Sequence, residues 1–463
     1  MTTTAATYDD AATRQREQRS WYWYDWANSA YVTTTATVLL APYLTSVAER
    51  AACGFVGAED RPCREDLAVL GLQLSPGSIV FYAITATTLI SALVLPVVGA
   101  IADRSPAQRK LMARLAWTGA AAATAMGLVA GTNWQLGVAL LFVANLSLGG
   151  SLVVYDAILC RIATPDERDR VSSRGWALGY LGGGLLLALN LALVTFADPL
   201  GLSTSTAVRI SLVLAGLWWA AFTLVPYRGL RDRVPIPTDG EAELSSSGLL
   251  RRSFGQLWAT LRSTRQYPQT LLFLVAYLFY NDGIQTVIAS ASVYGEKELG
   301  LETSFLILSI LIVQFVAFAG ALLFGRVAAT WGSKRTIIAG LTVWCLVVFA
   351  GYFLPAGAPG AFLGLATGIG LVLGGTQALS RSFYSQLVPT GREAEYFSLY
   401  QACERGTSWL GTLLFGVIYQ LTDSYRPAIL ALLVFFLLGL ALLVPLDARR
   451  AIREAGNEPP AVV

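Results

Sequence analysis

Apolar residues gather into twelve stretches, each long enough to cross a membrane as a helix. A helix needs about 20 mostly apolar residues to span the hydrocarbon core of a bilayer. The pattern predicts an all-α integral membrane protein with twelve transmembrane helices, over residues 22–47, 77–101, 111–131, 133–160, 174–197, 206–226, 268–291, 303–325, 335–355, 359–387, 395–421 and 427–446.

The composition agrees with a lipid environment and removes several classes of chemistry. Hydrophobic residues make up 55% of the 463 residues, charged residues only 14%, and mean hydropathy is +0.55. Soluble proteins carry about 25% charged residues. The chain has no histidine, which excludes His-dependent triads and HExxH zinc sites. We therefore expect no enzyme activity, no metal and no cofactor, and the net charge of +3 is too small to indicate a nucleic-acid partner.

The basic residues predict the orientation. Most of the 33 lysines and arginines fall in segments that share one side of the membrane if the N-terminus is cytoplasmic. Cytoplasmic loops carry an excess of Lys and Arg, so we expect both termini in the cytoplasm and the protein in a cell (inner) membrane. The opposite loops hold only Arg50, Arg61, Arg64, Arg209, Lys297 and Arg426.

Two landmarks repeat at nearly one spacing and divide the chain into halves. Gly99 and Gly325 follow the second and eighth stretches, and Pro165 and Pro389 follow the fourth and tenth. A duplicated six-helix unit is typical of transporters whose substrate site lies between the halves. We expect a tail at 1–20, a bundle at 21–226, a linker at 227–267 with an amphipathic helix over 251–265, a second bundle at 268–446 and a tail at 447–463.

The loops after the second and eighth stretches resemble those of the major facilitator superfamily. The resemblance implies two pseudo-symmetric six-helix bundles. The first loop keeps the glycine, the acid and the basic residues, whereas the second has Ala329 in the acidic position, which puts its coupling role in doubt. The matching residues are Gly99, Asp103, Arg104 and Arg109, and then Gly325, Gly332, Lys334 and Arg335.

A narrower resemblance begins in the first stretch. Trp23-Tyr-Asp-Trp-Ala-Asn-Ser-Ala-Tyr31 is similar to the signature of the vacuole-effluxer-like branch, the family of the autophagy-related amino-acid effluxer. Tyr277-Leu-Phe-Tyr-Asn-Asp-Gly283 and Gly375-Thr-Gln-Ala-Leu-Ser-Arg381 extend the likeness into the second half. The resemblance implies efflux of a solute such as an amino acid, driven by the proton gradient.

A layer of charge lies about two turns or less from the predicted cytoplasmic face. Asp25 and Asp156 lie there with Arg174 and Arg381, all within roughly 10 Å of that face at 1.5 Å per helical residue. Paired charges offset the desolvation that each would suffer alone. We expect a cytoplasmic gate in which the carboxylates pair with Arg174 or Arg381; a permanent ion pair or snorkelling at the interface is the alternative.

Deeper charges are candidates for coupling. Asp282, Glu404 and Arg405 lie near the middle of their stretches, where ionisable residues are rare and usually functional. With no histidine present, Asp282 and Glu404 are the predicted proton carriers, and Arg405 suits a carboxylate or phosphate of the substrate. The alternative is that these residues only join helices.

Neutral polar residues in the stretches suit a small solute with several hydrogen-bonding groups, although for each of them contact between helices is the alternative. The candidates for substrate binding are Asn28, Tyr31, Asn145, Tyr280, Asn281, Gln285, Gln314, Gln377 and Gln401, together with Arg405. Cys53 and Cys63 share the long outward loop, and because the outside is oxidising we expect a disulfide between them.

These features predict a monomeric secondary active transporter. It would move a small polar solute by alternating access with protons as the coupling ion, among membrane lipids. A lipid or lysolipid transporter on the same scaffold is the alternative, and it would need a lateral opening and an apolar cavity around Arg405.

Overall fold

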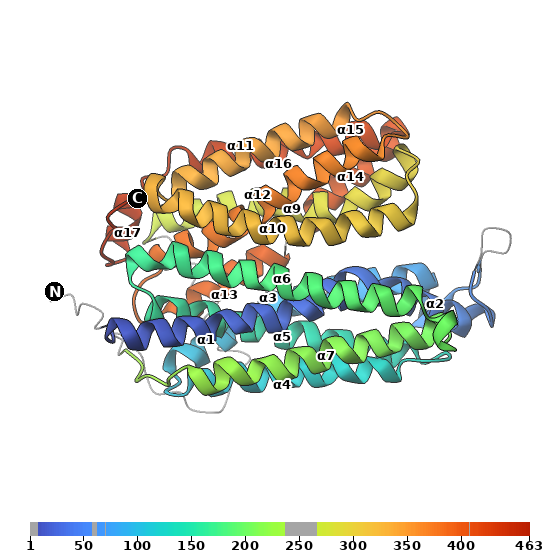
Figure 1. Ribbon diagram of the computed structural model, residues 1–463, viewed down its shortest axis with the longest axis horizontal. Helices are drawn as coiled ribbons and strands as arrows, with labels where there is room; N and C mark the ends of the chain where they lie inside the picture. Colours follow the sequence, from blue (N-terminus) through green and yellow to red (C-terminus); the bar gives the residue numbers. More distant parts are fainter. Residues whose placement is uncertain (1–7, 58–62, 70, 237–265, 407) are drawn as a thin grey trace.

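The computed structural model describes residues 8–57, 63–69, 71–236, 266–406 and 408–463. This part of the chain is nearly all helical, and its long helices lie side by side along the longest axis of the molecule (Figure 1). A short antiparallel hairpin pairs β1 (Leu67–Val69) with β2 (Leu72–Leu74), with Leu67 opposite Leu74. The helix predicted over 251–265 lies outside the described residues.

The helices before residue 230 follow the first six predicted spans, with different ends at several of them. They are α1 (Ala11–Ala30), the π-helix η1 (Tyr31–Leu39), α2 (Leu40–Cys53), the 3-10 turn η2 (Pro76–Ser78), α3 (Ile79–Arg104), α4 (Gln108–Ala125), η3 (Met126–Leu128), α5 (Trp134–Ile162), η4 (Pro165–Glu167), α6 (Arg168–Thr195), η5 (Asp198–Leu200) and α7 (Thr204–Gly229).

The helices after residue 265 follow the last six spans, and Leu432 interrupts the last of them. They are α9 (Pro268–Val293), the π-turn η6 (Tyr294–Glu298), α10 (Thr303–Trp331), α11 (Ser333–Tyr352), α12 (Pro359–Gln386), α13 (Glu393–Gly406), α14 (Ser408–Thr422), α15 (Tyr425–Ala431), α16 (Leu433–Leu443) and α17 (Ala448–Glu454).

Within the described ranges, nine helices are long and apolar enough to cross a membrane. They coincide with nine of the twelve predicted spans. The other three predicted spans, 22–47, 111–131 and 395–421, contain helices that are more charged, shorter or broken. The structure is therefore that of a multi-pass membrane protein.

The first span differs most from its prediction. It begins at Ala11, because Asp10 caps α1 by accepting a hydrogen bond from the Thr13 amide at 3.1 Å. The middle is a nine-residue π-helix, η1, that contains four threonines. The Thr37 hydroxyl donates to the Val32 carbonyl at 2.9 Å, and such bonds compete with regular α-helical pairing. The predicted tail at 1–20 is thus partly the start of a long, irregular helix.

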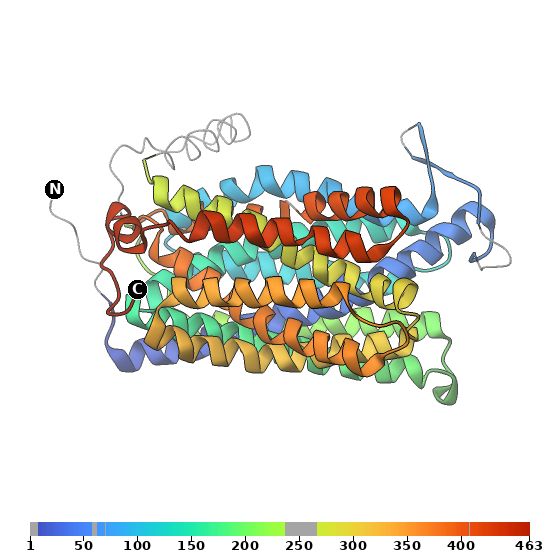
Figure 2. The same cartoon turned by 90° about the horizontal axis from the view of Figure 1, so that it is seen from above.

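The helices form two groups that meet along a seam. In Figure 1 the helices up to α7 make the lower layer and most of the later ones the upper layer. The groups touch where α6 packs on α10 and where α13 packs on α3. The start of α1 and the C-terminus lie at one end of the molecule in Figures 1 and 2; we call this the tail end. The opposite end carries the β-hairpin and we call it the hairpin end.

The loop-motif residues join the groups at the tail end. Asp103 accepts hydrogen bonds from the amides of Ala394 and Glu395, each at 2.8 Å. Carboxylates are favoured at such helix N-termini. A Cβ on Gly99 would lie 2.5 Å from the Ala394 carbonyl oxygen, so the approach requires glycine.

The second copy of the motif has no acidic residue of its own, and a carboxylate from the other group, Asp169, bonds to the helices beside it. Ala329 is exposed, whereas Asp169 of α6 accepts hydrogen bonds from the hydroxyls of Ser333 and Ser382 at 2.6 Å. Gly325 packs against Ser173 of α6. Other motif residues make contacts within one group. Arg109 binds Asp232 at 3.0 Å, and Lys334 donates to the carbonyls of Val444 and Leu446. Gly332 ends α10 with φ +86°, and Arg335 is exposed.

Further contacts stabilise the loop at the hairpin end and the C-terminal residues at the tail end. At the hairpin end a disulfide joins Cys53 to Cys63, with Cα atoms 5.9 Å apart. At the tail end, α17 and the residues after it pack on the protein. Asn457 donates to the carbonyls of Gln386 and Val388 at 2.9 and 2.8 Å, and the Ala461 amide donates to Asp166 at 2.7 Å across the seam.

Candidate functional site

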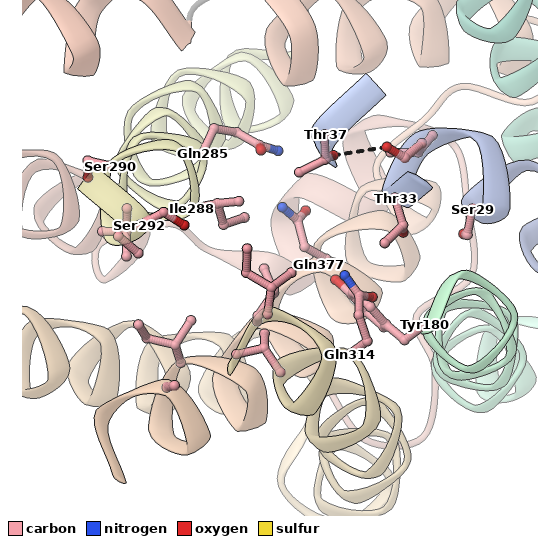
Figure 3. Close-up of a pocket in the computed structure, with 18 of the residues that line it drawn as sticks. Ser29, Thr33, Thr37, Tyr180, Gln285, Ile288, Ser290, Ser292, Gln314 and Gln377 are labelled. Carbon is pink, nitrogen blue, oxygen red and sulfur yellow. Dashed lines mark hydrogen bonds between the residues drawn. The ribbon is translucent and has the colours of Figure 1, made fainter. Parts of the chain in front are cut away.

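A cavity of about 290 Å³ lies between the two groups. Residues of α1, η1, α5 and α6 line one side, and residues of α9 to α13 line the other. Figure 3 shows Gln285, Gln314 and Gln377 from the later helices directed towards the space that Thr33, Thr37 and Tyr180 border from the earlier helices. The cavity is therefore built jointly by the two groups.

An ion-pair cluster at the tail-end side of this cavity joins the groups; we call it the floor. The Arg381 guanidinium of α12 binds Asp25 of α1 with two contacts, Nη2 to Oδ2 at 2.9 Å and Nη1 to Oδ1 at 3.3 Å. The same Nη1 lies 3.4 Å from Asp156 Oδ1 of α5. All three side chains are buried, with at most 8% of each exposed.

The surroundings of Arg381 hold its guanidinium in one place. It lies over the ring of Trp21 at 4.7 Å from the centroid, and over Tyr155 and Trp176 at 5.4 Å. Ser172 accepts from Nε at 3.0 Å through its hydroxyl. A cation over aromatic faces in a dry site gains about 2 kcal/mol or more. The floor is therefore a buried contact that crosses the seam in this structure.

Glu404 and Arg405 line the wall above the floor on α13. The Gln401 amide, one turn earlier, donates to Asp156 Oδ2 at 2.8 Å and to Glu404 Oε2 at 3.2 Å. Its carbonyl oxygen accepts from Arg405 Nε at 3.2 Å. The wall thus offers one carboxylate and one guanidinium to the cavity, and a single amide connects both to the floor.

The hairpin-end side of the cavity is apolar. Its wall within the later helices is made of branched and aromatic side chains from α10, α11, α12 and α15, among them Leu306, Val348, Phe362, Ile369 and Ile429. The cavity therefore places charged groups near the floor and a hydrocarbon surface further away, a division that suits a solute with a polar head and an apolar side chain.

The structure brings part of the predicted substrate set to the cavity. Lining residues from that set are Asn28, Gln285, Gln314, Gln377, Gln401 and Arg405. The others are absent from its walls and bond to neighbouring helices instead. Tyr31 donates to Asn145 at 3.0 Å, Tyr280 pairs with Ser380 at 2.6 Å, and the Asn281 amide donates to the Glu404 carbonyl at 3.1 Å. For these four the alternative of helix-to-helix contact describes the structure.

Arg174 does not belong to the floor; of the two arginines that the gate prediction offered, Arg381 makes the pairs. Arg174 is exposed and lies beside Tyr22. Its neighbour Gly175 faces the floor, where a Cβ would lie 2.5 Å from Asp25 Oδ2. Successive helical residues point about 100° apart, so Arg174 cannot face the same side. Depth in the membrane placed both arginines in one layer and did not show which way they point.

The two predicted proton carriers have different positions. Glu404 lines the cavity. Asp282 is fully buried on the side of α9 that packs against α14, where a Cβ on Gly411 would lie 3.2 Å from its Oδ2. It is not among the described residues that line the cavity.

The sequence reasoning missed several cavity residues that carry no charge and no amide. Ser29, Thr33 and Thr37 of the first span and Trp176 and Tyr180 of α6 line the cavity. The serine and threonines lie at intervals of four residues, so one face of the span carries them. That spacing is the signal in the sequence that identifies these residues as one polar face.

Comparisons with known proteins agree with this architecture. Residues 13–456 match the family described as vacuole effluxer Atg22 like. The chain is 29% identical to the MFS-type transporter YxiO of Bacillus subtilis over 450 residues, which cover 96% of this chain and 98% of that one.

Two solved structures share the fold at low sequence identity. The human organic anion transporter MFSD10 superposes with a TM-score of 0.68 at 14% identity, covering 93% of this chain and 99% of that one. The major facilitator transporter FucP in its outward conformation gives 0.65 at 12% identity, covering 94% and 98%. The chain belongs to the vacuole effluxer Atg22-like family of major facilitator transporters, and it is a membrane transporter rather than an enzyme.

Proposed function

We propose that this protein is a secondary active transporter that exports a small zwitterionic solute with an apolar side chain, of the amino-acid type, by alternating access coupled to protons. The observation that carries the proposal is the cavity between the two helix groups, with Glu404 and Arg405 on its wall and the Arg381 floor beneath. The family description as a vacuole effluxer supports export.

The charged groups and the apolar wall suggest how such a solute would bind. Arg405 would take the carboxylate through its planar fork, and Glu404 would take the ammonium group. The side chain would then extend towards Phe362 and Ile369. Pockets of this kind gain affinity from apolar walls and orientation from a few polar groups. A neutral sugar would leave both charged residues without a partner, at a cost in desolvation.

The proposed transport cycle has twelve spans in two six-helix bundles that rock about the cavity. The described hydrogen bonds across the seam cluster at the tail end, so this state is closed there. The excess of basic residues in the tail-end loops favours a cytoplasmic tail end. The cavity then belongs to the outward-facing state. The cytoplasmic side can open only after Arg381 separates from Asp25 and Asp156.

Protons would reach Glu404 from the outside through this cavity. Glu404 is our first candidate for the coupling carboxylate because it lies where the solute binds. Asp282 remains a second candidate, away from the cavity and buried between helices. We place the protein in a cell (inner) membrane as a monomer, with lipids around its exposed apolar helices.

The test is transport by the purified chain in proteoliposomes with an imposed pH gradient. We expect leucine to be moved, and 4-methylpentanoate and isopentylamine, which each lack one charged end, to be moved poorly. Arg405→Gln should abolish the transport of leucine. Arg426→Gln, at an arginine that binds Glu298 at 3.1 Å away from the cavity, is the matched control and should retain it. Equal transport of the one-charge analogues would refute the zwitterion site.

A lipid or lysolipid transporter is the second candidate, and one observation favours it. A groove of about 320 Å³ on the outer face between α11 and α12 is lined by apolar residues and glycines, and Val347 and Leu365 line both this groove and the cavity. An acyl chain could pass there if the two side chains moved. Transport of a lysolipid without transport of leucine in the same liposomes would show that the protein is a lipid transporter.

A further inference from the structure

The side chain of Gln401 stands between the floor and the cavity wall. Its amide nitrogen has two hydrogens, and it donates one towards Asp156 across the seam and one towards Glu404 in its own helix. Its oxygen accepts from Arg405. The residue is 2% exposed, so water does not readily replace these partners.

Each carboxylate holds one hydrogen of this amide, so the position of the amide is a compromise between the two. A hydrogen bond to an ionised acceptor is about twice as strong as one to a neutral acceptor. When Glu404 is ionised and empty, it shares the amide with Asp156. When a proton or a substrate ammonium neutralises Glu404, the amide is free to bind Asp156 more tightly. Because Asp156 belongs to α5 and Gln401 to α13, that change strengthens a contact across the seam.

We propose that Gln401 is a positioning residue that couples the charge state of Glu404 to the closure of the floor. This inference rests on the proposed function, because it assumes that Glu404 takes up a cation during transport. A cation on Glu404 then favours the closed tail end. By linkage, the closed tail end holds that cation more tightly than the open one. For the proton, this difference favours binding in the outward-facing state and release once the tail end opens.

Several other ionisable groups surround Glu404 and are shared by all the variants that we compare. They are Asp25 on α1, Asp156 on α5, Tyr180 on α6, Tyr277 on α9, Arg381 on α12, and Tyr400 and Arg405 on α13. Gln401 is uncharged and does not titrate. Its replacement therefore removes the hydrogen bonds that link Glu404 to Asp156 and leaves the number of titrating groups unchanged.

Cys160 provides a reporter of the floor. It lies 5% exposed at the tail end of α5, with its sulfur 3.7 Å from the Ser385 carbonyl of α12 across the seam. In a chain with Cys345→Ala and Cys403→Ala, a maleimide should react with Cys160 when the tail end opens, since Cys53 and Cys63 are bonded to each other. The measured quantity is the labelling rate against pH in the purified protein.

We expect the parent chain to label about tenfold more slowly at low pH than at high pH, within the usual range of coupling between sites. Glu404→Gln should label slowly at every pH. Gln401→Leu should label fast at every pH, with less than about a twofold change. Gln108→Leu removes an amide that donates to the Ala102 carbonyl at 3.0 Å within the earlier helices, away from the cavity, and it should keep the pH dependence of the parent.

The outcomes separate this inference from the proposed function. A Gln401→Leu chain that keeps the full pH dependence, or a parent without any, overturns the coupling role even if leucine is transported. A chain that shows the predicted labelling but transports a lysolipid instead of leucine overturns only the proposed substrate. A Gln401→Leu chain that labels fast and has also lost its cooperative thermal unfolding overturns the assignment in favour of a packing role.

Discussion

Replacing Arg381 by lysine should open the tail end. Arginine binds Asp25 through two nitrogens and contacts Asp156 with one of them, while its flat guanidinium lies over Trp21. Lysine keeps the positive charge but is a compact point charge without the planar fork. We therefore expect Arg381→Lys to hold one carboxylate and to release the other.

The size of the effect follows from these contacts. A hydrogen bond to a charged group contributes about 1.5–3 kcal/mol, and the stacking on aromatic rings contributes about 1–2 kcal/mol in a desolvated site. The loss of one carboxylate contact and part of the stacking gives about 3 kcal/mol against the closed floor. Since 1.4 kcal/mol is a factor of ten, the open fraction should rise about a hundredfold.

The labelling rate of Cys160 measures this fraction at constant pH. The control is Arg426→Lys, because Arg426 pairs with Glu298 at the hairpin end and does not cross the seam. The thermal unfolding of both variants shows whether the fold is intact. A change of less than threefold in a folded Arg381→Lys protein would show that the ion pairs do not hold the floor closed, and that they are a permanent feature of the fold.

Three further predictions concern neighbouring contacts. Gly175→Ala should raise Cys160 labelling about tenfold, because its Cβ would lie 2.5 Å from Asp25 Oδ2 and must displace this partner of Arg381; an unchanged rate would contradict this. Asn457→Ala removes hydrogen bonds of about 1 kcal/mol each that dock the C-terminal residues beside the seam, so labelling should rise several-fold. The control is Asn133→Ala, which removes two hydrogen bonds within the earlier helices. A chain with both Cys53→Ser and Cys63→Ser should unfold at a lower temperature, by the equivalent of about 2–3 kcal/mol for a short loop, and should transport at the parental rate; equal unfolding temperatures would refute the contribution of the disulfide.

The hydrophobic pattern predicted helices over all twelve stretches, and nine of them satisfy the length and hydropathy expected of a span in the described chain. It did not predict the π-helix of the first span, the division of the last span into α15 and α16, or the pairing of β1 with β2. These features depend on local hydrogen bonding and on contacts with other helices. A periodicity of apolar residues carries no information about either.

The site was predictable in its charges and less so in its contacts. Depth alone grouped Asp25, Asp156, Arg174 and Arg381 and left the choice of arginine open. The repeat would have decided it. The landmarks Gly99 and Gly325, and Pro165 and Pro389, imply an offset close to 225, which relates α5, starting at Trp134, to α12, starting at Pro359. The same offset relates Asp156 to Arg381, so the two residues occupy equivalent places in the halves and face each other across the seam.

The charges that this arrangement connects do not balance. Asp25, Asp156 and Glu404 supply three carboxylates to the linked set, and Arg381 and Arg405 supply two guanidinium groups. An uncompensated charge in a buried site is costly, so the empty cavity favours the uptake of one more cation. A proton on Glu404 meets this need. The ammonium of the proposed solute would pair with the same carboxylate while the solute carboxylate pairs with Arg405, and the proton and the ammonium cannot occupy Glu404 together. Competition between them for one site is what an exchange of protons for an exported amino acid requires, and it follows from the side chains around Gln401 without a separate coupling site.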